Sequence, residues 1–188
     1  YEQLVARAAE APVGSDGLFF LPFLTGERLG AHRNARAQFF GLGATHGLSH
    51  INRAILEGVA FAGARHLKIM EKASGQTIER VIASGGGAKT ALWLKIKASL
   101  YGVPIVVPEE QECGILGCAV MGAVATGQFS TLDAAVTAIV RYTDEIQPDP
   151  AWQARYQRMQ PIFDKLYFNS QALYDDLDAL AELSLPEE

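Results

Sequence analysis

Three consecutive glycines constrain the fold of this chain more than any other feature of its sequence. Gly85, Gly86 and Gly87 follow a short β-branched segment at 81–83 and precede a helical pattern that stops at Gly102. Residues without a Cβ let the backbone bend tightly, and they let a flat or anionic ligand approach the main chain. The sequence therefore predicts a strand, a tight turn and a helix at this place, as in α/β proteins.

The same turn carries groups that suit a nucleotide. A helix that begins after a turn offers free N–H groups and a positive dipole end to a phosphate or a ribose hydroxyl. Lys89 adds a cation there, and Thr90 adds a hydroxyl. A P-loop is absent because Ala83 and Ala88 stand where it needs glycine, and Thr90 breaks the dinucleotide fingerprint. These local features support nucleotide contact and a purely architectural turn equally well.

The rest of the chain alternates strand patterns with helix patterns. Strands are predicted at 18–21 and 105–107, and a helix is predicted from its N-cap Ser49 to Gly75. Further helices are predicted at 2–11, 114–126, 131–140 and 149–183. This order predicts α/β layering with at least two parallel strands, which right-handed crossovers connect.

The segment from Thr25 to Gly43 is polar and has no clean period, which is typical of a functional or mobile loop. For the adjacent charges Glu27 and Arg28 we favour a solvated or mutually paired surface, with binding of a polar ligand as the alternative. For Arg33 and Arg36 we favour ordinary surface charge, with contact to a phosphate as the alternative. Glu57, in the following helix, is either a surface carboxylate paired with Arg53 or half-buried against this loop.

Composition excludes several classes of protein. With 188 residues, of which 49% are hydrophobic, the chain is long enough to bury a core as one domain or one lobe. A net charge of −5 argues against a nucleic-acid partner, and the apolar runs are too short to cross a membrane. Cys113 and Cys118 suit neither a disulfide framework nor a metal site, so we expect both to pack as small apolar groups in a reducing compartment.

As a set, five motifs resemble the C-terminal lobe of the FGGY carbohydrate kinases, and among these the xylulokinases most. The matching segments are 21–28, 34–42, 54–61, the turn at 85–90 with Trp93, and 112–117. The similarity runs from about residue 18 to residue 167. Each motif is weak alone, but the set is specific to the family.

The resemblance implies an actin-like (ribonuclease H-like) ATPase fold with two lobes, between which ATP and the sugar meet. Residues 1–188 would form a partial C-terminal lobe, and the N-terminal lobe of the same polypeptide would lie outside this chain. Nucleotide contacts would then come from Gly85, Gly86, Gly87, Lys89 and Thr90, and Mg²⁺ would arrive with ATP. The general base would belong to the N-terminal lobe, so no catalytic residue is assigned here, no metal ligand is predicted, and the chain alone is expected to be inactive.

The acceptor implied by the resemblance is a pentulose such as xylulose. Leu29–His32 and Cys113–Cys118 depart from the xylulokinase pattern, so gluconate, ribulose or a related polyol stays an alternative. A non-catalytic nucleotide-binding or regulatory module is a second alternative. A nicotinamide-dependent enzyme is disfavoured because the strand at 105–107 ends without an acidic residue for the ribose. We expect a cytoplasmic protein, and the sequence leaves a homodimer open.

Overall fold

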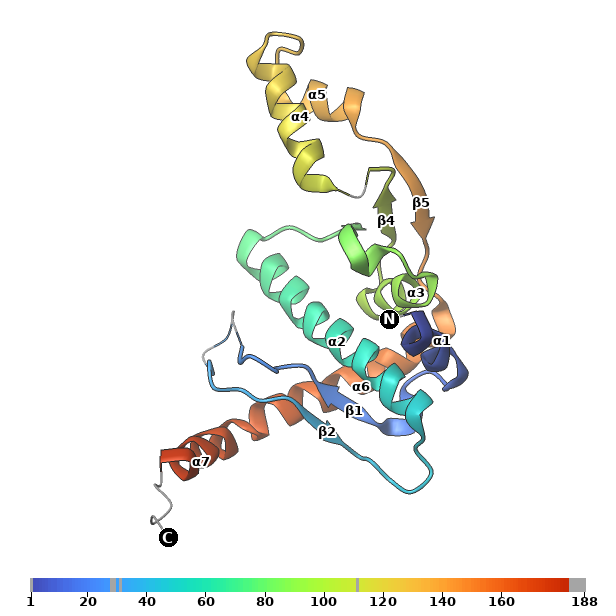
Figure 1. Ribbon diagram of the computed structural model, residues 1–188, viewed down its shortest axis with the longest axis vertical. Helices are drawn as coiled ribbons and strands as arrows, with labels where there is room; N and C mark the ends of the chain where they lie inside the picture. Colours follow the sequence, from blue (N-terminus) through green and yellow to red (C-terminus); the bar gives the residue numbers. More distant parts are fainter. Residues whose placement is uncertain (1, 28–29, 31, 111, 183–188) are drawn as a thin grey trace.

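The computed structural model describes residues 2–27, 30, 32–110 and 112–182. Its helices form a central body, an arm at one end and an extension at the other (Figure 1). The body contains α1 (Glu2–Glu10), α2 (Leu48–Ser74), α3 (Ala91–Tyr101) and α6 (Pro150–Asn169). The arm contains α4 (Cys113–Ala125) and α5 (Leu132–Ile139), and the extension is α7 (Gln171–Glu182). The predicted helices are therefore all present, although the last is divided into α6 and α7.

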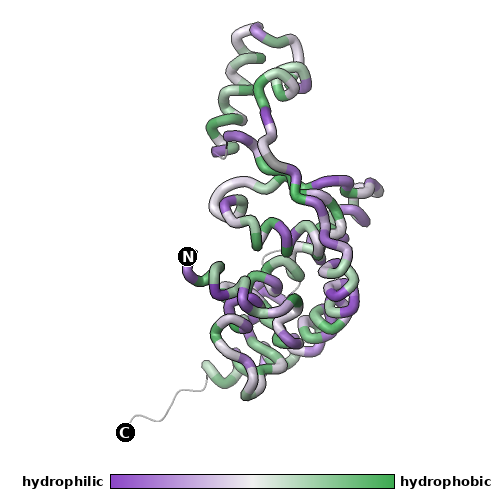
Figure 2. Tube along the Cα trace, turned by 90° about the vertical axis from the view of Figure 1, so that its right-hand side faces the viewer, coloured by the Kyte–Doolittle hydropathy of each residue, from purple (hydrophilic) through white to green (hydrophobic). Residues whose placement is uncertain are grey.

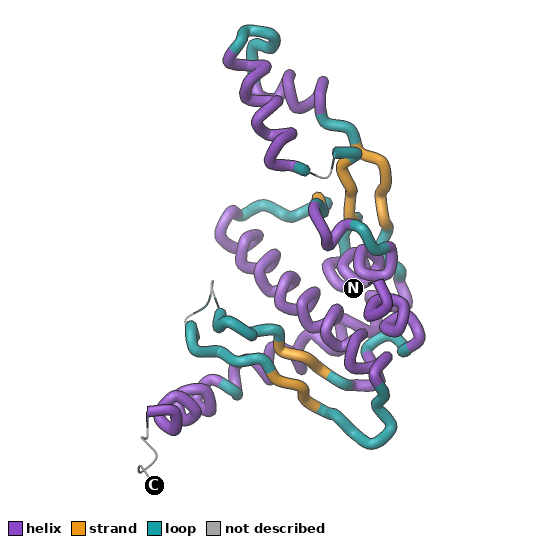
Figure 3. The backbone as a smooth tube through the Cα atoms, in the orientation of Figure 1, coloured by secondary structure: helices purple, strands orange, loops and turns teal. Residues whose placement is uncertain are grey.

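Two small sheets connect these helices (Figure 3). In the first, β3 (Val81–Ile82) runs parallel to β4 (Ile105–Pro108), and β4 pairs antiparallel with β5 (Tyr142–Ile146). In the second, β1 (Phe19–Leu21) pairs antiparallel with β2 (Gln38–Phe40). The predicted parallel crossover is confirmed for β3, α3 and β4. The strand predicted at 18–21 is also present, but it belongs to the separate hairpin-like pair.

The long helix α2 organises the main core. Its residues Ala60 and Phe61 are almost fully buried against β1 and α6. The ring of Phe61 stacks on that of Phe163 with centroids 5.2 Å apart and meets the ring of Tyr156 edge-on at 5.8 Å. Such aromatic pairs add to the free energy gained from burial. The core therefore fixes α6 against α2 and so positions everything that α2 carries.

Glycines determine where the two inner helices end. Gly75 and Gly102, each in the left-handed region at φ 68° and 74°, cap α2 and α3 as predicted, because a residue without a Cβ adopts this conformation without strain. The start of α2 differs from the prediction. Gly47 is its N-cap, and Ser49 lies inside the first turn.

The arm leaves much of its apolar surface exposed. Helix α4 packs mainly on α5, and Ile115 and Met121 are 70% and 58% exposed. Figure 2 shows the hydrophobic residues of the arm in green at the top of the view. Cys118 is exposed and Cys113 half-buried, both with free thiols, so the expectation that both cysteines pack inside is wrong. The reason is that only one side of α4 has a neighbour within the described part of the chain.

Across the described residues, no helix combines the length and the hydrophobicity needed to cross a bilayer.

Candidate functional site

The glycine turn lies directly after the C-terminal end of β3. Ser84 is extended, residues Gly85–Ala88 form a single 3-10 turn, and Thr90 precedes the first residue of α3. The Lys89 N–H donates to the Gly86 carbonyl at 3.4 Å, which closes the turn. The predicted order of strand, turn and helix is thus confirmed.

The fold constrains the three glycines to different degrees. Gly85 has φ +68°, a backbone conformation that is strained for a residue with a side chain. A Cβ on Gly87 would lie 3.2 Å from Lys97 Nζ and 3.4 Å from the Trp93 ring, so packing keeps this position small. Gly86 has neither constraint, because its φ lies outside the left-handed region and a Cβ there would meet nothing within 4 Å. The fold alone does not explain Gly86, whose backbone borders open space.

That space is a hollow of about 300 Å³ lined by Glu2, Gly86, Lys89, Thr90 and Trp93. The structure therefore brings together three of the predicted site residues. Gly85 and Gly87 do not line the hollow and instead shape the turn beside it.

Two of the lining residues, Trp93 and Glu2, were not predicted to belong to the site. Trp93 lies in the first turn of α3, three residues after the N-cap Thr90, and this short spacing is a signal that the sequence does carry. Glu2 comes from the first turn of α1. No local pattern in the sequence connects it with a turn more than 80 residues away.

Two of the residues that line this hollow carry a polar atom without a partner. Thr90 Oγ1 and Trp93 Nε1 are buried, and neither has a hydrogen-bond partner within the described residues. Buried polar atoms nearly always have a hydrogen-bond partner. Two buried atoms without one, in residues that line a hollow, therefore suit a ligand with hydroxyl or phosphate oxygens. The residues present thus fit the sugar and phosphate groups of a nucleotide.

Lys97 supports the turn from α3. Its Nζ donates to the Gly87 carbonyl at 3.5 Å and lies 4.0 Å from the centre of the Trp93 ring. Burial lowers the pKa of this ammonium group. Lys97 therefore holds Trp93 against the turn, whereas Lys89 is exposed at the mouth of the hollow.

The described residues include no group of three or more His, Cys, Asp or Glu side chains that could hold a metal ion.

A larger hollow of about 670 Å³, which Trp93 also lines, lies between the loop at 22–27, α2 and α3. Glu27 lines it and is only 6% exposed. The Tyr167 hydroxyl donates to this carboxylate, and Arg65 Nη1 and His66 Nε2 approach it at 3.9 and 3.8 Å. The expectation of a solvated Glu27 is therefore wrong, because these groups from α2 and α6 replace water around it.

The other charged residues of the loop segment behave differently. Arg36 lies at the surface, as predicted, and pairs there with Asp178 of α7 at 2.6 Å. Arg33 is exposed. Arg28, together with Leu29 and Ala31, lies outside the described residues.

Glu57 is neither a surface carboxylate nor half-buried. Its side chain is 2% exposed and pairs with Arg53 Nε at 2.8 Å, so the pairing is confirmed but its place at the surface is wrong. The same carboxylate accepts hydrogen bonds from the Gly14 N–H, the Ser15 hydroxyl and the Tyr156 hydroxyl. Its role is to connect α2 with the turn after α1 and with α6.

Comparison with known proteins identifies similar sequences and structures. Residues 1–126 match the family model described as the FGGY family of carbohydrate kinases, C-terminal domain. The chain is 29% identical over 179 residues to a xylulose kinase of Staphylococcus epidermidis, covering 94% of this chain and 36% of that protein. It is 32% identical over 164 residues to a gluconokinase of Bacillus subtilis, covering 87% of this chain and 32% of that protein.

A solved structure, the ligand-bound xylulose kinase of Lactobacillus acidophilus, superposes with a TM-score of 0.87 at 28% identity. The match covers 94% of this chain and 36% of that one. The chain thus spans about a third of the length of the curated relatives it matches.

Proposed function

Because the chain belongs to the FGGY family of carbohydrate kinases and contains that family's C-terminal domain, we propose that it is the nucleotide-binding lobe of an ATP-dependent kinase for a pentulose such as xylulose. One observation carries the ATP assignment. The backbone of Gly86 faces open space beside two buried polar atoms, Thr90 Oγ1 and Trp93 Nε1, that lack partners among the described residues.

The domain has the actin-like ATPase fold of the sugar kinases. Residues 1–188 would be a partial C-terminal lobe, completed by an N-terminal lobe of the same polypeptide. Two features support further polypeptide around this chain: within the described residues β3 pairs only with β4, and α4 exposes a large apolar face. Burial of that face would contribute roughly 25 cal/mol per Å² of apolar area removed from water.

In this proposal the chain's own residues position the nucleotide. Gly86 would let the adenosine lie against the backbone, and Thr90, Lys89 and Trp93 would bind ribose hydroxyls or phosphate oxygens. Mg²⁺ bound to ATP would neutralise phosphate charge, and its ligands would be mainly phosphate oxygens and water. Phosphoryl transfer depends mostly on positioning and charge neutralisation, so a lobe that only holds the nucleotide still contributes to the rate. The base that deprotonates the sugar would come from the N-terminal lobe.

Calorimetry and thermal shift test the nucleotide assignment directly. We expect the chain to bind Mg·ATP weakly and to gain thermal stability from it, because bound ligand stabilises the folded state. NAD should give neither effect. Stabilisation by NAD but not by ATP would contradict the proposal and favour a nicotinamide-dependent enzyme.

The acceptor is tested with the full-length gene product that contains this chain. With ATP we expect the highest kcat/KM for xylulose, and lower values for ribulose and gluconate. The 32% identity to a gluconokinase makes gluconate the second candidate. The chain alone should show no turnover. If the full-length product phosphorylates none of these compounds yet binds ATP, a regulatory module replaces the enzyme as the better interpretation.

A further inference from the structure

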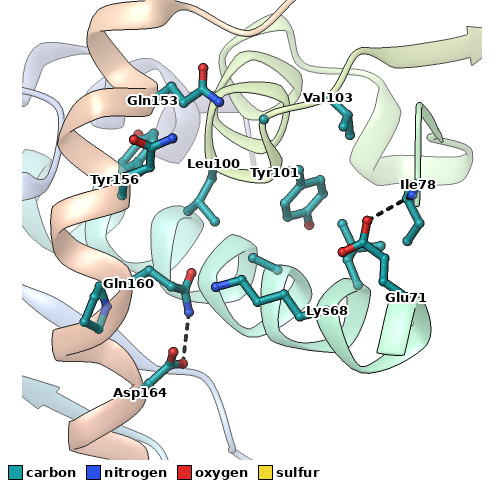
Figure 4. Close-up of a pocket in the computed structure, with 15 residues that line it drawn as sticks. Lys68, Glu71, Ile78, Leu100, Tyr101, Val103, Gln153, Tyr156, Gln160 and Asp164 are labelled. Atoms are coloured by element: carbon teal, nitrogen blue, oxygen red, sulfur yellow. Dashed lines mark hydrogen bonds between the residues drawn. The ribbon is translucent and has the colours of Figure 1, made fainter. Parts of the chain in front are cut away.

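A third cavity lies at the opposite end of α3 from the glycine turn. It has a volume of about 360 Å³ and is enclosed by α2, α3 and α6 (Figure 4). Ile78 and Val103, which line it, precede β3 and β4, whereas the glycine turn follows the C-terminal end of β3. Ligand pockets have volumes of about 300–1,000 Å³, so this one has room for a small molecule only.

A buried amide points into this cavity. Gln160 is 7% exposed, and its side chain extends from α6 toward α2 and α3 (Figure 4). Its Nε2 donates to Asp164 Oδ1 at 3.0 Å, which identifies the other amide atom as oxygen. That Oε1 is buried and has no donor among the described residues. A buried acceptor without a donor costs free energy, and a ligand hydroxyl in the cavity would recover it.

The charges around the cavity are nearly balanced. Lys68 contributes one positive charge and makes no ion pair with any described residue. Glu71 and Asp164 contribute two negative charges, of which Asp164 lies 3.6 Å from Arg65 Nε. Without an excess of positive charge, the cavity disfavours a phosphorylated or multiply anionic ligand.

The remaining lining combines hydrogen-bonding groups with an apolar floor. The Gln153 and Gln157 amides come from α6, and the Tyr101 hydroxyl comes from α3. Burial raises the pKa of Tyr101 to about 12, so its hydroxyl keeps its proton at neutral pH and can donate. The apolar floor consists of Leu67, Ile78, Leu100, Val103 and Pro161.

We propose that this cavity binds a small neutral polyhydroxylated molecule, such as a linear polyol or a monosaccharide. Its hydroxyl groups would donate to Gln160 Oε1 and accept from Lys68 and Tyr101, and its C–H groups would lie on the apolar floor. This inference does not depend on the proposed kinase activity, since it uses neither the glycine turn nor ATP.

The test is an NMR titration of the ¹⁵N-labelled chain with xylitol, gluconate and inorganic phosphate in parallel. Xylitol should shift the Gln160 side-chain NH₂ signals and the backbone amides of Gly102 and Val103 in a saturable manner. The signals of Gly85–Thr90 should stay in place. Gluconate and phosphate should produce smaller shifts at equal concentration. The proposal is wrong if xylitol leaves the cavity signals unchanged, or if either anion binds there more tightly than xylitol.

Two matched variants separate binding from folding. Gln160→Met keeps the side-chain length but removes the carbonyl, and we expect xylitol affinity to fall at least about tenfold. Gln128→Met makes the same change at an exposed residue outside the cavity and should leave affinity unchanged. Circular dichroism establishes that each variant is folded. If Gln160→Met is folded and binds xylitol like the wild-type chain, the proposal fails. If Gln160→Met is unfolded, Gln153→Met takes its place under the same criterion.

Discussion

The Tyr156 hydroxyl donates a 2.8 Å hydrogen bond to Glu57 Oε1, although 99 residues separate the two in sequence. Burial, and to a lesser degree the negative charge of Glu57, raise the pKa of this hydroxyl, so it remains a donor over the physiological range. Glu57 also receives the Gly14 N–H at 2.9 Å and the Ser15 hydroxyl at 3.1 Å. Ser15 has a positive φ of 47°, so these bonds stabilise a turn that is strained.

Glu57→Gln should destabilise the fold strongly. The variant removes the charge that balances Arg53, whose side chain is 2% exposed, and a buried cation without its partner costs about 3–5 kcal/mol. The free energy of unfolding, measured by urea denaturation, gives the size of the effect. The double variant Arg53→Met/Glu57→Gln removes both charges but keeps an acceptor oxygen at residue 57 for the donors of Gly14 and Tyr156, so it should cost less than Glu57→Gln alone. A loss below about 1 kcal/mol for Glu57→Gln would mean that the pair is solvated.

Gly86→Val should weaken nucleotide binding more than it weakens the fold. The added side chain would enter the open space where the adenosine is proposed to lie, so we expect ATP affinity to fall at least about tenfold, a cost of roughly 1.4 kcal/mol. The unfolding free energy should change by less than about 1 kcal/mol, since a Cβ at Gly86 meets no neighbour within 4 Å.

Gly85→Val provides the contrast within the same turn. Gly85 has φ +68°, so this variant should lose stability by about 1–2 kcal/mol or more from backbone strain. Calorimetry with ATP and urea denaturation measure the two effects separately. If Gly86→Val unfolds while the remaining folded protein binds ATP normally, the turn is only architectural.

Thr90→Val should weaken ATP binding without lowering the stability of the fold. Thr90 Oγ1 is buried and has no partner within the described residues, so exchanging the hydroxyl for a methyl group should leave stability unchanged or raise it. ATP affinity should fall about threefold to tenfold, the value of one neutral hydrogen bond. Thr131→Val is the matched control, since Thr131 Oγ1 accepts from the Ala134 N–H at the start of α5. It should cost about 1 kcal/mol of stability and leave ATP binding unchanged.

The sequence predicted the elements whose causes are local. Gly75 and Gly102 end their helices because left-handed caps favour glycine, and the parallel pair β3–β4 follows from two apolar strands separated by a helix. The fold class and the family were predicted from the motif set, and both are confirmed by the family match and the structural neighbours.

Two strands escaped prediction for physical reasons. Strand β2 is three residues long with two exposed phenylalanines, and β5 reads Tyr-Thr-Asp-Glu-Ile, so neither shows the apolar alternation of a half-buried strand. Their partners β1 and β4 decide their conformation. The burial of Glu57 is likewise set by Gly14 and Tyr156, which lie far away in sequence.

The candidate site was predicted in part. Gly86, Lys89 and Thr90 line one hollow, and the neighbouring glycines shape the turn. Trp93 was recognised only as part of a family motif, because nothing in the sequence indicates that its Nε1 is buried without a partner. Glu2 reaches the hollow through the packing of α1, which no local pattern specifies.

Asp149→Asn should lower stability at neutral pH and have no effect in strong acid. Asp149 accepts from the Lys95 ammonium at 2.9 Å and from the Ala151 and Trp152 N–H groups at the start of α6. The Lys95 hydrogen bond, followed by that of Trp152, lowers the pKa of Asp149 below its usual 3.8. A carboxyl group whose folded pKa is depressed stabilises the fold above its unfolded pKa, and this contribution is lost as the pH falls through the folded pKa.

Urea denaturation between about pH 2 and pH 7 measures this dependence. The difference between wild type and Asp149→Asn should be constant above about pH 5 and should disappear at the acid end. Asn retains the capping oxygen, so the pH-dependent part reports the charge rather than the cap. In a Lys95→Met background the same substitution should have a smaller effect, because the first contributor to the shift is gone. A difference that persists unchanged into acid would show that Asp149 acts through the cap alone.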